Sequence, residues 1–171
     1  MFKTKKNRIE LDAAAKTFTS SEIAGIAGVS LRQLQWWDEQ KVVSPLHEGH
    51  KRVYLTEEAV EIAVMAELRR KGFSLQTIRR LLRFLQREMG RGLADVESSA
   101  SDLHLVTDGK SIYLEDRNER IIDILKKASQ PMFLVCVSDQ IRRLGVPLES
   151  VGRKPVRSES APSAARKSRA V

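Results

Sequence analysis

The chain has 171 residues and a net charge of +8, from 30 Lys and Arg against 22 Asp and Glu. This length allows one or two small domains, and the basic balance makes a polyanion the first partner to consider. No apolar run approaches the ~20 residues that a membrane span needs, and no apolar stretch follows the basic start of the chain. The single cysteine, Cys136, excludes an internal disulfide and a multi-cysteine metal site within one chain. We therefore expect a cytoplasmic protein without membrane association.

Both ends of the chain are basic. Residues 1–17 carry five basic and two acidic residues, and residues 151–171 carry six basic residues and one acidic residue. We interpret residues 1–17 as a basic arm and residues 149–171 as a disordered basic tail, because the tail is rich in Pro, Ser and charge and has few large apolar groups. The arms either add non-specific phosphate contacts or only keep the protein soluble.

Two short helices joined by a Gly-containing turn are predicted next. Hydroxyl side chains at residues 19–21 suit a helix N-cap, Gly28 breaks that helix, and Ser30 caps a second helix over residues 31–40. At 100° per residue, Leu31, Leu34 and Trp37 lie on one side of the second helix. The opposite side carries the long polar and aromatic residues Arg32, Gln33, Trp36 and Gln40. That set suits the groove of DNA and would make a poor core.

A hairpin and two further helices complete the first half. Residues 46–55 read as a hairpin with Gly49 near its middle and basic residues on its second arm. Thr56 is expected to cap a helix that Gly72 ends, and Ser74 is expected to cap a fourth helix. The fourth helix has an apolar stripe and stops at residues 90–92; the stripe comprises Leu75, Ile78, Leu81, Leu82, Leu85 and Met89.

Several pieces of residues 19–89, in this order, carry a resemblance to a known family: Gly28-Val29-Ser30-Leu31-Arg32-Gln33-Leu34, Trp36-Trp37-Asp38, Ser44-Pro45, Arg52-Val53-Tyr54, and Gly72-Phe73-Ser74-Leu75 with Ile78. The region resembles the mercury-resistance-regulator (MerR) family of winged-helix transcription regulators. No single piece is specific to this family, but the joint order and spacing of the pieces are specific to it. The resemblance says nothing about residues 93–171.

The resemblance implies a set of DNA-binding residues. The second helix would enter the major groove and the hairpin would form a wing on the flanking backbone. The candidate contacts are Ser30, Arg32, Gln33, Gln35, Trp36, Lys51, Arg52 and Tyr54, with Tyr54 packing beneath the wing arginine Arg52. The chain departs from the family at Gln35, where Arg is common, at Trp36 and Trp37, where Tyr is common, and at Lys41, where Gly is usual.

The second half predicts a ββαβ unit. Asp108-Gly109 suits a two-residue primed turn, which would pair Leu105 with Ile112 and Leu103 with Leu114. Residues 117–128 read as a helix, residues 132–137 as a strand buried on both faces, and Ser138 as the cap of a last short helix. We recognise no known domain here, and no catalytic constellation, cofactor motif or metal cluster. Cys136 is interpreted as an inert core thiol.

The predicted fold class is α+β. It comprises a basic arm (1–17), a winged helix-turn-helix domain (18–89), a ββαβ domain for dimerisation or sensing (93–148) and a disordered tail (149–171). The expected function is sequence-specific DNA binding for transcriptional control, as a homodimer on an inverted repeat, without enzymatic activity or cofactor. RNA polymerase and a partner protein are further candidate partners. The usual dimerisation helix after residue 89 is missing, so we assign dimerisation to the fourth helix or the ββαβ unit.

Two alternative functions stay open. The protein could be an antitoxin-like adapter whose ββαβ unit binds a partner protein, which co-purification would reveal. It could also be an architectural, excisionase-like factor, for which weak sequence preference with strong bending would be diagnostic. The operator, the inducing signal and the choice between activation and repression are not readable from the sequence.

Overall fold

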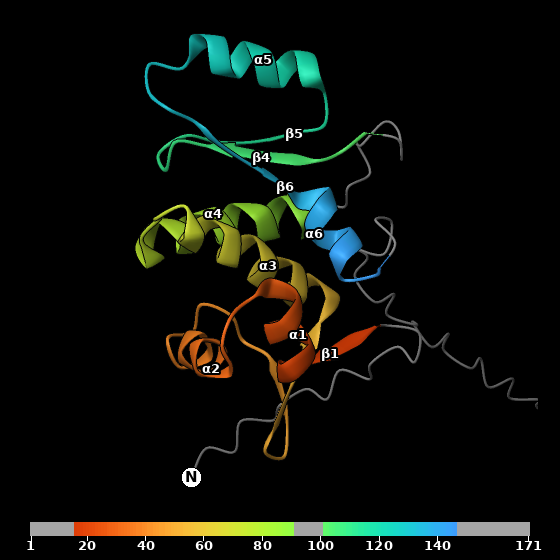
Figure 1. The fold of residues 1–171 in the computed structure, drawn as a ribbon. Coiled ribbons are helices and arrows are strands. Elements are labelled where there is room, and N and C mark those ends of the chain that lie inside the picture. The colour runs from red at the N-terminus through yellow and green to blue at the C-terminus, as the bar shows by residue number, and fades with distance from the viewer. Residues whose placement is uncertain (1–15, 91–100, 147–171) are drawn as a thin grey trace, which may run out of the picture.

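A computed structural model describes residues 16–90 and 101–146. The predicted N-terminal arm up to residue 15, and the predicted tail from residue 149, lie outside the described residues. Stacked layers make up the described part (Figure 1): helix α5 (Asn118–Lys127) at one end, a three-stranded sheet below it, helices α3 (Thr56–Arg70) and α4 (Leu75–Gly90) next, and the first two helices with a second small sheet at the other end. The predicted α+β class is confirmed.

The first half forms the predicted helix-turn-helix and hairpin. Helix α1 (Ser20–Ala27) starts with a capping box between Thr19 and Glu22, and α2 (Leu31–Glu39) is capped by Ser30, whose Oγ accepts from the Gln33 N–H at 3.1 Å. The hairpin comprises β2 (Leu46–Glu48) and β3 (Lys51–Leu55). The prediction missed strand β1 (Thr17–Thr19), which pairs antiparallel with β3 and buries Phe18. Three residues are too few to show an alternating pattern.

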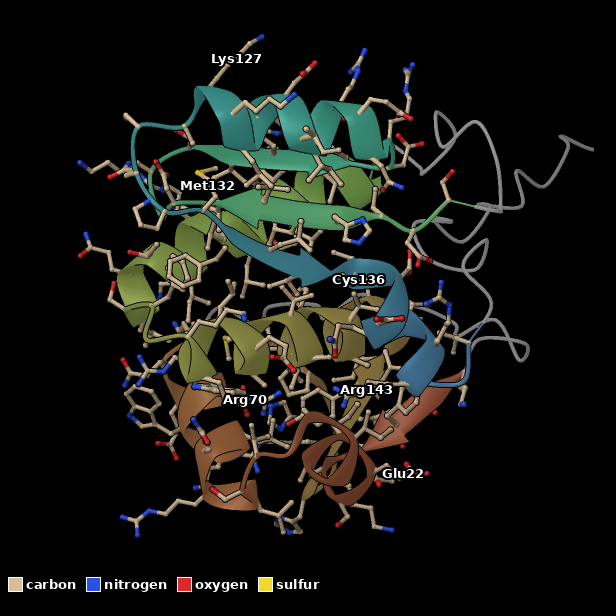
Figure 2. All side chains as sticks on the ribbon, turned by 45° about the horizontal axis from the view of Figure 1, so that its top comes forward. Glu22, Arg70, Lys127, Met132, Cys136 and Arg143 are labelled. Atoms are coloured by element: carbon tan, nitrogen blue, oxygen red, sulfur yellow. The ribbon has the colours of Figure 1, made fainter. Side chains whose placement is uncertain are left out.

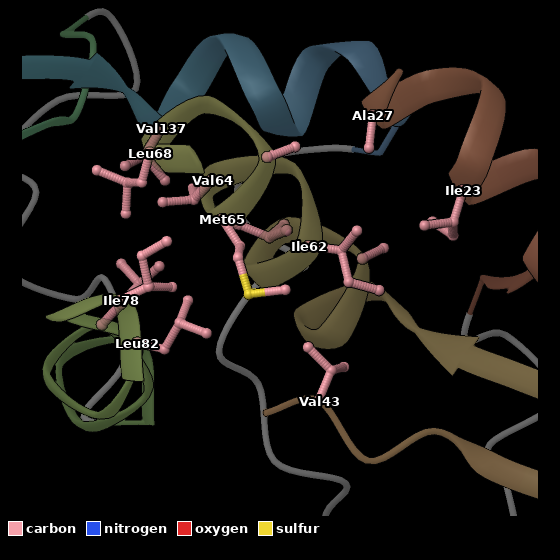
Figure 3. Close-up of a cluster of buried hydrophobic side chains, with 14 of the residues drawn as sticks. Ile23, Ala27, Val43, Ile62, Val64, Met65, Leu68, Ile78, Leu82 and Val137 are labelled. Atoms are coloured by element: carbon pink, nitrogen blue, oxygen red, sulfur yellow. The ribbon is translucent and has the colours of Figure 1, made fainter. Parts of the chain in front are cut away.

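Helix α3 (Thr56–Arg70) is the centre of the molecule. It is buried on nearly every side, including Val60, Ile62, Val64 and Met65, so it lacks the polar face of a surface helix. Figure 3 shows its side chains meeting those of α1, of α4 (Leu75–Gly90) and of Val137 from the second half. Its N-cap is Leu55 and not Thr56 as predicted, because the Glu58 carboxylate accepts from the Leu55 N–H at 2.8 Å.

The second sheet has the order β5-β4-β6, from β4 (His104–Thr107), β5 (Ile112–Glu115) and β6 (Phe133–Cys136). The predicted register is wrong by two residues: Leu105 pairs with Leu114, and Thr107 with Ile112. The Asp108 carboxylate accepts from the N–H groups of Lys110 and Ser111, so the turn takes four residues instead of two. A shift of two preserves the faces, so the apolar residues still share one side.

That apolar side packs against the first half. Leu103, Leu105 and Val135 belong to the same buried cluster as the core residues of α3 and α4. The ring of Phe133 meets that of Phe73, from the turn between those helices, at 4.9 Å between centroids. This side is therefore covered by the chain itself and does not offer a free face to a second copy.

Three further details of the second half differ from expectation. Strand β6 is an edge strand with Leu134 exposed, so it is not buried on both faces. The last helix, α6 (Val137–Arg143), starts after Cys136, and Ser138 instead accepts from the Leu103 N–H at 2.8 Å. Cys136 is only partly buried. Helix α5 (Asn118–Lys127) lies where it was predicted.

The end of α2 has a left-handed residue that is not glycine. Lys41 has φ of 54°, and its N–H donates to the Asp38 carbonyl while the Val42 N–H donates to the Trp37 carbonyl, which is a Schellman ending. The equivalent position after α3 is Gly72, with φ of 90°. A side chain in this conformation carries a steric cost that glycine avoids.

We expect Lys41→Gly to raise the free energy of unfolding by about 0.5–1 kcal/mol, because relief of the left-handed strain exceeds the extra entropy of glycine in the unfolded chain. Denaturant melts followed by circular dichroism measure this change. Gly72→Ala is the reciprocal control and should destabilise, since no atom crowds a Cβ there and only the backbone conformation opposes it. A Lys41→Gly variant that is less stable than the unmodified protein would contradict the conclusion that Lys41 is strained in its left-handed conformation.

Candidate nucleic-acid interface

Helix α2 presents one buried and one exposed face. Leu34 and Trp37 are buried and fix the helix to the core, whereas Arg32, Gln35 and Trp36 point to solvent, with Trp36 43% exposed. Leu31, which helical spacing places on the buried side, is 54% exposed, so that expectation is wrong. The exposed face therefore offers a guanidinium, amides and an indole, groups that can contact the edges of bases or phosphates.

The predicted contact residues on α2 differ in their exposure and in the hydrogen bonds that their side chains already form. Ser30 is exposed, but its Oγ serves as the helix cap. Gln33 is half-buried, and the Gln35 amide donates to the Glu39 carboxylate at 2.9 Å. No acidic residue stands in the first turn of α2, so the positive end of its dipole is not neutralised there. Arg32 is the one cationic residue of this helix, and it is exposed.

The hairpin is held against α2 by one carboxylate. The Asp38 Oδ2 accepts from Arg52 Nε at 2.6 Å and lies 3.3 Å from His47 Nε2. His47 and Arg52 are cross-strand partners, so Asp38 contacts both strands of the hairpin. The contact raises the pKa of Arg52 through the hydrogen bond to Asp38. We name Asp38, His47 and Arg52 the wing clamp.

The other predicted hairpin residues have distinct places. Lys51 is exposed next to the turn, where a phosphate can reach it. Tyr54 is 1% exposed and packs beneath the hairpin, and its burial raises the pKa of its hydroxyl. From this buried position Tyr54 contacts no ligand, so its place among the candidate DNA contacts is corrected: it is a core residue of the hairpin.

The sequence reasoning assigned no role to Asp38 or Arg79. Asp38 lies in the last turn of α2, where a negative charge opposes the helix dipole, and that misfit is a signal that a cation must approach from elsewhere. Arg79, from the first half of α4, donates to the Gln40 carbonyl at 2.8 Å and so satisfies the end of α2. Two elements distant in sequence thus fix the orientation of α2.

A cavity of ≈ 600 Å³ lies beside the end of α2. Its lining comes from residues 41–44, from α3 and from α4, and combines the acidic residues Glu57, Glu58 and Glu61 with Lys41, Arg79 and Arg83. Burial raises the pKa of Glu58 to about 7 and that of Glu61 to about 7, while hydrogen bonds from the Leu55 N–H and from Gln86, respectively, oppose the shifts. Glu61 is only 6% exposed.

A second basic contact ties α3 to the helix-turn-helix. Arg70 donates to the Ala27 carbonyl at 3.0 Å, at the end of α1, and to the Glu67 carboxylate at 2.7 Å (Figure 2). Within residues 16–90 and 101–146, no helix is long and apolar enough to cross a membrane, and no cluster of three or more potential metal ligands occurs.

Two helices joined by a glycine turn, an exposed second helix and a clamped hairpin define a winged helix-turn-helix domain. Residues 18–85 match the family model described as MerR HTH family regulatory protein. This part of the chain is therefore a helix-turn-helix domain of the MerR family, as the sequence resemblance predicted.

Relatives point the same way. The chain is similar to uncharacterized HTH-type transcriptional regulators of Mycobacterium bovis and of two strains of Mycobacterium tuberculosis, at 29% identity over 124 residues in each case. The matched region covers 70% of this chain, and it spans about half (52%) of each relative. The match is longer than the helix-turn-helix domain, so it includes part of the second half.

The wing clamp predicts energetic coupling between α2 and the hairpin. In a double-mutant cycle of Asp38→Ala and Arg52→Ala, we expect a coupling energy of ~1 kcal/mol, because the ion pair is partly shielded from solvent. Urea melts of the four proteins measure it. The pair Glu67 and Arg70, which is more exposed, is the control and should couple less. Additive effects at Asp38 and Arg52 would show that the clamp stabilises nothing.

Stability should also depend on the two buried carboxyls. Their folded pKa of about 7 lies above the ordinary value of 4.5 for a glutamate, so their neutral forms stabilise the fold below pH 4.5, and this contribution is lost as the pH rises through about 7. We expect the free energy of unfolding to fall between pH 5 and pH 8, and Glu61→Gln to reduce that fall by ~1 kcal/mol or more. Glu48→Gln, which removes an exposed carboxylate of the hairpin, is the control, and an unchanged pH profile in Glu61→Gln would refute the assignment.

Proposed function

We propose that the protein is a transcriptional regulator that binds double-stranded DNA sequence-specifically, as a homodimer on an inverted-repeat operator. The observation that carries the proposal is the exposed face of α2, anchored by Leu34 and Trp37 and flanked by the clamped hairpin. The family match over residues 18–85 and the naming of the relatives as HTH-type transcriptional regulators support it.

In this proposal the two elements divide the work. Arg32, with Gln33, Gln35 and Trp36 around it, reads base edges or the groove wall from α2. Lys51 and the guanidinium of Arg52, which is already oriented through its Nε by Asp38, bind phosphates beside the groove. The Ser30 cap keeps the start of α2 in place, and Tyr54 supports the hairpin from below.

The test begins with selection of bound sequences from a random DNA library, using the full chain. Arg32→Ala should then weaken binding to the selected operator by ~1–3 kcal/mol while largely preserving non-specific binding. Arg117→Ala, an exposed arginine at the start of α5, is the control and should bind like the unmodified protein.

Lys51→Ala separates the roles within the same assay. It should weaken binding to all sequences about equally and lower the salt slope by ~1, as a lost phosphate contact does. Selection that enriches no sequence would refute sequence-specific binding, and strong bending of unrelated DNA would favour the architectural alternative. A loss of thermal stability in Arg32→Ala would mean that this side chain supports the fold and does not read DNA.

A further inference from the structure

Large exposed apolar side chains of the described part gather in two places. Leu31 and Trp36 lie on α2, in the proposed DNA interface, and the other four lie at the opposite end of the molecule. These four come from α5 and from the two edge strands of the second sheet: Tyr113, Ile122, Leu125 and Leu134.

Helix α5 lies over the outer side of the second sheet (Figure 1), and this side is closed at the middle strand but open at both edges. Val106 pairs with Tyr113 on one flank and with Leu134 on the other, so the three form a row across the sheet. Val106 is fully buried, whereas Tyr113 is 39% and Leu134 is 42% exposed. The row therefore ends in an uncovered apolar residue on each edge strand.

The two edges are not equivalent. A cavity on the β5 side is lined by Tyr113 and Glu115 together with Arg120, Asp123 and Lys127 of α5, and Arg120 forms an ion pair with Glu115 at 3.9 Å. This charged side of α5 thus faces β5. At 100° per residue, Ile122 and Leu125 lie on the opposite side of α5, toward β6 and Leu134. We name Ile122, Leu125 and Leu134 the β6 patch.

Strand β6 itself lacks the features that protect sheet edges. It is paired with β4 on one side only, and its four residues, Phe133 to Cys136, include no charge and no proline. An apolar edge strand beside an apolar helix face is a template for another strand.

We propose that the β6 patch is the dimer interface, in which β6 pairs antiparallel with β6 of a second copy and the two α5 helices lie alongside each other. The proposal rests on the proposed function, which needs two copies on an inverted repeat. Antiparallel pairing of identical strands places the two-fold axis perpendicular to the sheet. Because α5, the sheet, α3 with α4, and α2 with the hairpin are stacked along that direction, both DNA-binding elements then lie at the same end of the dimer (Figure 1).

Charge supports a second copy as the occupant. The solvent side of α5 next to the patch carries Glu119 in its first turn and Lys126 in its last turn. The two-fold axis runs the helices antiparallel, so Glu119 of each copy approaches Lys126 of the other, and the helix dipoles oppose. The basic C-terminal segment 151–171 matches this surface poorly, since it has one acidic residue and few large apolar groups.

The test is the mass of the full chain without DNA, by sedimentation equilibrium over a range of concentrations. We expect the unmodified protein to be a dimer and Leu134→Lys to raise the dimer dissociation constant about tenfold or more, because a charge enters an apolar interface. Tyr113→Lys is the matched control, since it alters the same row at similar exposure on the other edge, and should remain dimeric.

A second variant guards against unfolding. Leu125→Lys changes an exposed helix position, so its circular dichroism melt should match that of the unmodified protein while its dimer weakens as in Leu134→Lys. An unmodified protein that is monomeric throughout, or folded variants that dimerise normally, would overturn the proposal, as would equal disruption by Tyr113→Lys. The readout contains no DNA, so its failure is separate from a failure to bind an operator.

Discussion

The structure depends on the burial of α3 from nearly all sides. A helix without a polar face must be covered by other elements, and here α1, α4, α6 and both sheets cover it. Since α4 holds the end of α2 through Arg79 and α3 holds the end of α1 through Arg70, the same helix pair that fills the core also orients the two helices of the helix-turn-helix. The contacts that pack the core therefore also set the orientation of α1 and α2.

Local patterns in the sequence predicted much of this structure. The caps at Thr19 and Ser30, the turn at Gly28, the hairpin at residues 46–55 and the end at Gly72 all follow from residue chemistry within a few positions, and all are present. The failures have both local and distant causes. The four-residue turn depends on how the Asp108 side chain folds back onto the backbone, and β1 exists only because β3 offers it a partner.

The site shows the same division. Arg32, Gln35, Trp36 and Lys51 are exposed, as a binding surface requires, and that much follows from helical spacing and hairpin position. The sequence shows Asp38 only as a negative charge in the last turn of α2, where it opposes the helix dipole. No local pattern indicates that Arg52 and His47 contact it. The apolar residues 103, 105, 112 and 114 were correctly placed on one face, yet the sequence did not reveal that the first half of the chain covers that face.

The shared core has a consequence for how such a protein can evolve and be turned over. The helix-turn-helix domain is not an independent module. The flank of α3 that meets Val137 and Ile141 would face water if the second half were cut away. A cut between the halves would therefore expose a hydrophobic strip next to α1 and α2, and exposed apolar strips of this kind favour aggregation and proteolysis. Gene fusions that exchange the second half must bring a matching surface for α3 with them.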